Sequence, residues 1–159
     1  MTDSPRIAHP GVWFPPPFVY VAGFVAGWLL ERWRPLPITA GASTTREVGG
    51  WAALLVWLGF FVGALVSFRR AHTTLIPNKP AAAFVTSGPY GMTRNPMYVS
   101  LVALYLGLML LINSWWPAIF LPFVVLVVDR FVIAREERYL ASAFGAEYDE
   151  YKRQVRRWL

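Results

Sequence analysis

The residues best suited to bind a ligand lie in one short stretch from Ser87 to Ser100, with the sequence SGPYGMTRNPMYVS. Its glycines and prolines predict a dense turn, and Asn95 followed by Pro96 is typical of an N-cap and the first position of a helix. Such a helix start offers free backbone N–H groups and a positive dipole end, which with Arg94 would suit a carboxylate or phosphate. We expect the active site here. The alternative is that Asn95 and Pro96 only start a transmembrane helix and that Arg94 lies among lipid head groups.

A second group of charged residues follows later in the chain. Glu136 and Glu137 are adjacent, so they cannot share one helical face, and this arrangement suits ligand binding better than paired acid–base catalysis. A carboxylate near a membrane interface is costly unless it is paired, and it could bind an ammonium group or ribose hydroxyls. The alternative is a solvated pair balanced by the neighbouring arginines. Asp129 and Arg130 could simply mark the point where a helix leaves the bilayer.

The composition indicates an integral membrane protein with a single domain. Of the 159 residues 56% are hydrophobic and the mean hydropathy is +0.42, whereas soluble proteins contain about 45–50% apolar residues. Cysteine is absent from the sequence, which excludes disulfides, thiolate nucleophiles and cysteine metal sites. His9 and His72 lie far apart and away from any carboxylate cluster, so we expect no metal site.

The net charge of +6 does not indicate nucleic-acid binding, because the basic residues flank apolar stretches and do not form a soluble face interleaved with aromatic residues. Anionic lipid head groups are the expected partner. The N-terminal residues lack the pattern of a cleaved signal peptide, so we expect the first apolar block to remain in the chain.

Four apolar stretches predict an all-α bundle of about four transmembrane helices, because about 20 apolar residues cross a bilayer. The expected spans are residues 14–33, 49–68, 96–113 and 115–134. Residues 49–68 carry no charge and form the clearest span, within which Gly59 and Gly63 form a GxxxG pattern that favours helix packing. The tail predicts an amphipathic helix over residues 144–158, lying in the head-group plane or folding back over the site as a cap.

The distribution of basic residues predicts a multi-pass protein with both termini in the cytoplasm. One side then holds twelve of the fifteen Lys and Arg residues, namely Arg6, Arg69, Arg70, Lys79, Arg94 and the seven from Arg130 onward. The opposite side holds Arg32, Arg34 and Arg46. This topology places the Ser87–Ser100 stretch and the Glu136 region at the same membrane face.

The order of these motifs resembles a known superfamily. GPYGMTRNPMYVS, a spanning hairpin, EERYL and FGAEYDEY follow one another between about Phe84 and Val155. The series is similar to the membrane methyltransferases that include isoprenylcysteine carboxyl methyltransferases and phospholipid methyltransferases. The resemblance implies S-adenosylmethionine as methyl donor, bound between the loop before the third span and the helix leaving the fourth.

The resemblance also assigns residues to roles. The cofactor-binding positions would be Phe84, Val85, Tyr90, Asn95, Pro96, Met97, Tyr98, Glu136 and Glu137, and Arg130 would be a catalytic arginine near the acceptor. One departure is informative: the isoprenylcysteine branch usually has His where this chain has Asn95, whereas NPMY looks like the phosphatidylethanolamine branch. Since an amide does not titrate near neutral pH, Asn95 is not a general base.

The residues fit methyl transfer to a lipophilic acceptor. A sulfonium donor is already activated, so the enzyme mainly aligns the acceptor, excludes water and holds the cation. Arg130 could orient a carboxylate acceptor, whereas an amine acceptor must lose a proton and would need a carboxylate such as Glu136. Two alternatives stay open: a reductase-like protein that binds NADPH through Arg153, Arg156 and Arg157, and a small membrane protein without catalysis.

Overall fold

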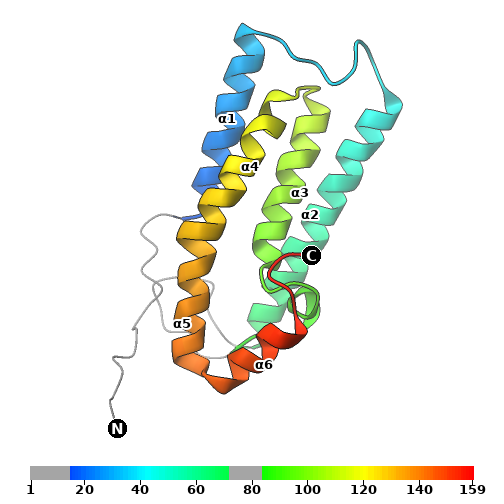
Figure 1. The fold of residues 1–159 in the computed structure, drawn as a ribbon. Helices are drawn as coiled ribbons and strands as arrows, with labels where there is room; N and C mark the ends of the chain where they lie inside the picture. The colour runs from blue at the N-terminus through cyan, green and yellow to red at the C-terminus, as the bar shows by residue number, and fades with distance from the viewer. Residues whose placement is uncertain (1–14, 72–83) are drawn as a thin grey trace.

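The computed structural model describes residues 15–71 and 84–159, and these ranges contain helices and no β-strand. The elements are α1 (Pro17–Trp33), α2 (Thr44–Arg70), the 3-10 turn η1 (Gly88–Gly91), α3 (Pro96–Leu111), α4 (Trp116–Val128), the π-helical turn η2 (Asp129–Ile133), α5 (Ala134–Phe144) and α6 (Ala146–Gln154). Helices α1 to α4 run side by side, and α5 and α6 continue at one end of the bundle (Figure 1). The all-α prediction is confirmed. His9 and His72 lie outside the described residues.

Two of the described helices are long and apolar enough to cross a membrane. One is α2, and the other is the continuous helix Trp116–Phe144, made of α4, η2 and α5. The apolar helix α3 has 16 residues and α1 has 17, which is shorter than the roughly 20 residues that span a bilayer. That α1 and α3 cross the membrane therefore stays a prediction. Helix α2 begins earlier than the predicted residue 49, because Ser43 caps it by accepting a hydrogen bond from the Arg46 N–H.

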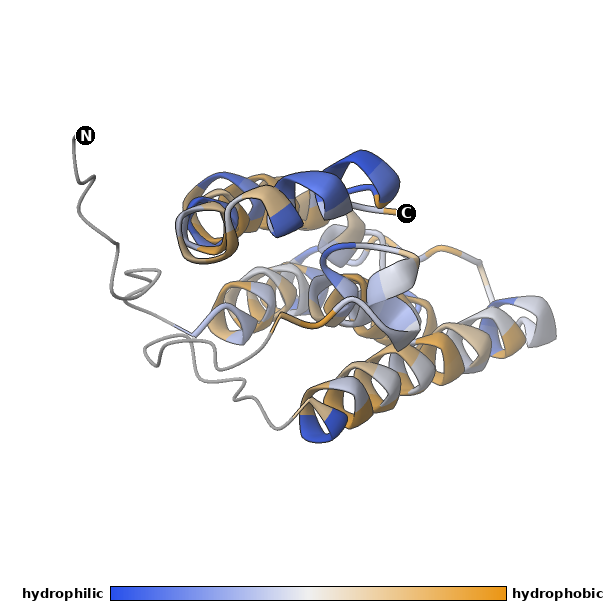
Figure 2. Cartoon of the chain, turned by 90° about the horizontal axis from the view of Figure 1, so that it is seen from below, coloured by the Kyte–Doolittle hydropathy of each residue, from blue (hydrophilic) through white to orange (hydrophobic). Residues whose placement is uncertain are grey.

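The basic residues are separated between the two ends of the bundle (Figure 1). Arg32, Arg34 and Arg46 lie where α1 ends and α2 begins, whereas Arg94 and the basic residues of α5 and α6 lie at the other end. Figure 2 shows hydrophilic residues gathered on the helices next to the C-terminus and hydrophobic residues along most of the bundle. This separation of basic residues agrees with the two groups of Lys and Arg expected from the sequence. The cytoplasmic orientation of the more basic end stays a prediction.

Asn113 ties the loop after α1 to the turn between α3 and α4. Its backbone is in the left-handed region, with φ 58°. Its side-chain oxygen accepts hydrogen bonds from the N–H groups of Ile38 and Thr39 at 3.1 and 3.0 Å, and its amide nitrogen donates to the Thr39 carbonyl at 3.0 Å. Glu31 at the end of α1 accepts a further hydrogen bond from Ser114 at 2.7 Å. These bonds align α1 with the α3–α4 hairpin.

Glycines bring the helices close together at particular points. A Cβ at Gly27 in α1 would lie 2.7 Å from the backbone nitrogen of Pro117 in α4, and a Cβ at Gly107 in α3 would lie 3.0 Å from the Gly50 carbonyl oxygen in α2. The two glycines of the GxxxG pattern do not contact a neighbouring α-helix in this way. Gly59 faces open space, and Gly63 lies against Pro89 of η1. Small residues thus permit the α1–α4 and α2–α3 contacts.

We expect Gly27→Ala to lower the free energy of unfolding by about 1–3 kcal/mol, because the added methyl group would overlap backbone that can yield only by moving a helix. Gly59→Ala is the matched control within an apolar helix, since nothing lies within 4 Å of its Cβ position, and it should be at least as stable as the wild type because alanine is the better helix former. Thermal unfolding in detergent micelles measures both. Equal stability of the two variants would contradict the close α1–α4 contact.

Candidate functional site

Tyr98 and Glu136 meet at the charged end of the bundle. Tyr98 lies in the first turn of α3 and Glu136 in the first turn of α5. The Tyr98 hydroxyl lies 3.0 Å from each carboxylate oxygen of Glu136 and donates a hydrogen bond to this group. Among the described residues Glu136 has this hydroxyl partner and no ion pair with Lys or Arg. The turn before α3 and the acidic start of α5 are therefore in contact.

Glu137 points to different partners from its neighbour. It forms an ion pair with Arg94 at 3.0 Å, and both side chains are largely buried, with exposures of 14% and 15%. The Arg157 guanidinium forms a second ion pair with the same carboxylate. The hydrogen bond to Glu137 raises the pKa of Arg157, so this arginine keeps its charge. Glu137 is thus held between two cations, as expected for two adjacent glutamates that face different ways.

Asp129 joins the same network from the π-helical turn η2. Its carboxylate accepts hydrogen bonds from Arg157 at 3.2 Å and from the Trp158 indole N–H at 3.1 Å. The turn widens because the Ala134 N–H bonds to the Asp129 carbonyl five residues back, and such π-bulges are frequent at functional sites. The sequence-based assignment did not include Asp129 or Arg157 among the cofactor-binding residues. The signal for Asp129 was its place in a charge pair directly after an apolar run, and Arg157 was considered only for NADPH.

The C-terminal segment folds back over the loop before α3. Thr93 and the Asn95 side chain donate hydrogen bonds to the Arg157 carbonyl at 3.0 and 2.9 Å, and the Arg94 N–H donates to the Arg156 carbonyl at 2.8 Å. Helix α3 begins at Pro96 as predicted. Asn95 occupies the N-cap position, as predicted, but its side chain makes no capping hydrogen bond, and its amide nitrogen donates to the tail.

The tail helix is also shorter than expected. Residues 144–158 were expected to be helical, but α6 covers Ala146–Gln154, because Gly145 adopts φ 52° and breaks the helix from α5, and Val155 is extended. The segment that covers the loop of residues 93–95 is therefore the non-helical end of the chain, residues 155–159, and not a helix.

Aromatic side chains attach α6 to the residues before η1. The ring of Phe84 lies 5.3, 5.6 and 5.1 Å from the rings of Phe144, Tyr148 and Tyr151. The Tyr151 hydroxyl donates to the Tyr90 carbonyl at 2.6 Å. Burial raises the pKa of Tyr148 to about 12, so its hydroxyl remains protonated and can donate a hydrogen bond.

The residues that the resemblance assigns to the cofactor therefore lie together. Phe84, Val85, Tyr90, Asn95, Pro96 and Met97 belong to the loop and helix start that α6 and the tail cover, next to Tyr98, Glu136 and Glu137. Arg130 does not join them: its side chain is exposed on η2, and no hydrogen bond or ion pair connects it to another described residue. Its catalytic role stays a prediction.

Two polar atoms in the site are buried without a hydrogen-bond partner among the described residues, Nε of Arg94 and the hydroxyl of Tyr148. Both can donate to a carboxylate, while Glu136 offers an unneutralised carboxylate to a cation. This set fits the amino-acid end and the sulfonium of S-adenosylmethionine. In residues 15–71 and 84–159, no group of three or more His, Cys, Asp or Glu side chains could hold a metal ion.

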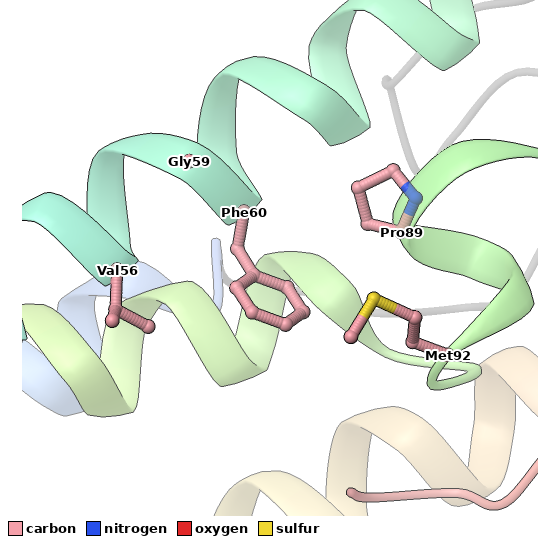
Figure 3. Close-up of a pocket in the computed structure, with 5 residues that line it drawn as sticks. All are labelled: Val56, Gly59, Phe60, Pro89 and Met92. Carbon is pink, nitrogen blue, oxygen red and sulfur yellow. The ribbon is translucent and has the colours of Figure 1, made fainter.

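A separate apolar recess of about 300 Å³ lies between α2 and η1 (Figure 3). It is lined by Val56, Gly59, Phe60, Pro89 and Met92. None of these side chains can titrate or carry charge, so the recess suits a hydrocarbon chain and not a reacting group.

Sequence comparisons place the chain among known proteins. It is 46% identical over 63 residues to an uncharacterized protein of Haemophilus influenzae, covering 35% of this chain and all of that protein. It is 35% identical over 113 residues to the cobalt-zinc-cadmium resistance protein CzcN of Cupriavidus metallidurans, covering 70% of this chain and 52% of CzcN. It is 32% identical over 71 residues to the protein-S-isoprenylcysteine O-methyltransferase of Schizosaccharomyces pombe, covering 45% of this chain and 30% of that enzyme.

The match to CzcN thus spans about half of that relative's length, and the match to the methyltransferase less than a third. No solved structure matches the chain significantly. Residues 48–147 match the profile of the phospholipid methyltransferase family, a range that includes Arg94, Tyr98, Glu136 and Glu137. This match covers more than half of the residues of the chain, and the chain therefore belongs to the phospholipid methyltransferase family.

Proposed function

We propose that this protein binds S-adenosylmethionine and transfers its methyl group to a lipophilic acceptor at the membrane. The observation that carries the proposal is the contact of the α3 start with the acidic start of α5, through Tyr98 and Glu136, inside the range that matches the family. We further propose that this end of the bundle faces the cytoplasm, where the charge pattern places it.

The residues present divide the tasks of such a site. Arg94 and Tyr148 have free buried donors for a carboxylate, and Glu136 would face the positive groups of the cofactor, because Glu137 is already paired with Arg94 and Arg157. When bound, the cofactor supplies a methyl group on a positively charged sulfur. The tail residues Arg157 and Trp158, fixed to Asp129, cover the site and exclude water, which strengthens every charge interaction beneath them.

We propose that the acceptor is an amine. Glu136 is a partly buried carboxylate with a hydroxyl partner and no cation among the described residues, so it would repel a carboxylate acceptor and attract an ammonium group. An amine must lose a proton to react, and the Glu136 carboxylate is the group placed to accept it. Arg130, which would orient a carboxylate acceptor, is exposed. The acyl or prenyl part of the acceptor would remain in the lipid.

The reductase-like alternative receives less support from the arrangement of charges. Of the three arginines that could bind the extra phosphate of NADPH, Arg157 is held by Glu137 and Asp129, and Arg153 pairs with Glu150. A protein without catalysis would bind neither cofactor. Labelled S-adenosylmethionine and labelled NADPH, offered separately to the detergent-solubilised protein, distinguish the three readings, and we expect binding of the first alone.

We expect Glu136→Gln to reduce methyl transfer to an amine lipid by about 10²-fold or more, because the amide cannot accept the proton. The test uses the full chain reconstituted in vesicles that contain phosphatidylethanolamine, with labelled methyl donor and extraction of the lipid. Glu147→Gln, on the exposed face of α6, is the matched control and should retain activity. Full activity of Glu136→Gln would exclude Glu136 as the base, and label in protein or carboxylate products would exclude the amine acceptor.

We expect Arg157→Gln to lower the free energy of unfolding by about 1–2 kcal/mol and to increase amide exchange in residues 155–159. The change leaves Glu137 and Asp129 with fewer charged partners, and the side chain is 36% exposed, so the loss is smaller than for a fully buried pair. Arg153→Gln removes an exposed ion pair on α6 and should change stability by less than about 0.5 kcal/mol. Unchanged exchange in Arg157→Gln would show that other contacts hold the tail.

A further inference from the structure

Tyr20 lies in the first turn of α1 and is 4% exposed. Its hydroxyl has no hydrogen-bond partner among the described residues. Burying an unpaired hydroxyl costs free energy, and native proteins rarely retain one without a reason. Helix α1 precedes residues 48–147, so the family match does not account for this residue.

The surroundings of Tyr20 suggest that reason. Tyr20 packs in one buried cluster with Tyr98, and the two phenols are close enough to interact electrostatically. Tyr98 in turn donates to Glu136. Oxygen atoms from α1, α3 and α5 therefore gather at one place in a core that is otherwise mostly aliphatic. The other buried members of the cluster are Tyr105, Val124, Val128, Val132 and Ile133.

This set of oxygens favours one class of ligand group. A phenol oxygen and a carboxylate both accept hydrogen bonds, and among the described residues neither the Tyr20 nor the Tyr98 hydroxyl is hydrogen-bonded to Lys or Arg. An ammonium group brings several N–H donors and a positive charge that Glu136 would neutralise. A carboxylate head group would bring acceptors and negative charge to the same place, which is unfavourable.

We propose that the Tyr20 hydroxyl binds the amine head group of the acceptor directly, so that α1 completes the acceptor site beside Tyr98 and Glu136. This inference rests on the proposed amine methyltransferase function and adds a substrate-contacting residue from outside the region that matches the family. It gives the unpaired hydroxyl a partner when the acceptor is present.

The test separates this role from simple packing. Tyr20→Phe keeps the ring and removes only the hydroxyl, so it should fold at least as stably as the wild type. Tyr105→Phe is the matched control for packing: its hydroxyl is also buried and unpartnered, and it belongs to the same cluster. That hydroxyl lies 3.5 Å from the Cβ position of Gly23, one turn further along α1 than Tyr20, and the Tyr105 backbone lies about 10 Å further along α3 than Tyr98. Both variants are made in the full chain.

The probe is hexadecylamine added to the protein in non-ionic detergent micelles, with hexadecanol as the uncharged comparison. Hexadecylamine should raise the unfolding temperature of the wild type and of Tyr105→Phe more than hexadecanol does, since a ligand that binds the folded state stabilises it. Tyr20→Phe should bind the amine about tenfold more weakly, the effect of losing one hydrogen bond to a charged group. Its affinity for S-adenosylmethionine should be unchanged.

Equal amine affinity of Tyr20→Phe and the wild type would overturn the proposal, as would a wild type that does not distinguish the amine from the alcohol. A parallel loss in Tyr105→Phe would also overturn it, because the effect would then belong to the core and not to a site. Amine binding that depends on Tyr20 without any binding of S-adenosylmethionine would contradict the proposed methyl transfer and leave the Tyr20 contact standing.

Discussion

Carboxylates withdrawn from water must find cations or hydrogen-bond donors, and this requirement organises the charged end of the bundle. Glu137 receives Arg94 from the loop before α3 and Arg157 from the tail. Asp129 receives Arg157 and Trp158. Three segments far apart in the sequence are therefore held together by two acidic side chains. Breaking one partner would leave a buried charge uncompensated, which is why the tail closes over the loop and does not lie free at the surface.

Glu136 differs from its neighbour in a way that bears on function. The two glutamates are adjacent in α5 but have different partners. Among the described residues, Glu137 pairs with two arginines, whereas Glu136 has only the Tyr98 hydroxyl. A fold selected only for stability would neutralise both carboxylates or remove them. An uncompensated carboxylate, together with the unpaired hydroxyl of Tyr20 and the unpaired donors of Arg94 and Tyr148, is the pattern of a site that is completed by a ligand.

The sequence predicts those parts of the fold that follow from local patterns. Apolar runs predicted the helices, Asn95 and Pro96 predicted where α3 begins, and the charge distribution correctly placed Tyr98 and Glu136 at one end. The tail contacts were not predictable, because they depend on the backbone carbonyls of Arg156 and Arg157, which carry no residue-specific signal. The widened turn that directs Asp129 toward the tail also depends on tertiary packing, and so does the exposure of Arg130. Gly145, which breaks the helix by adopting a positive φ, was the residue in the sequence that could have indicated that residues 144–158 do not form a single helix.

The closed tail has a consequence for how a cationic ligand would enter. Arg157 occupies the carboxylates of Glu137 and Asp129, and its own carbonyl binds Thr93 and Asn95. A second positive group beside Glu137 would be repelled by Arg94 and Arg157, whereas Glu136 has no such cation, so the positive part of a ligand is directed to Glu136 and its negative part to Arg94. The same network that stabilises the closed tail would thereby orient the zwitterionic cofactor of the proposed function. Arg157 is the most exposed member of these ion pairs, so its contacts are the least protected of those that hold the tail in place.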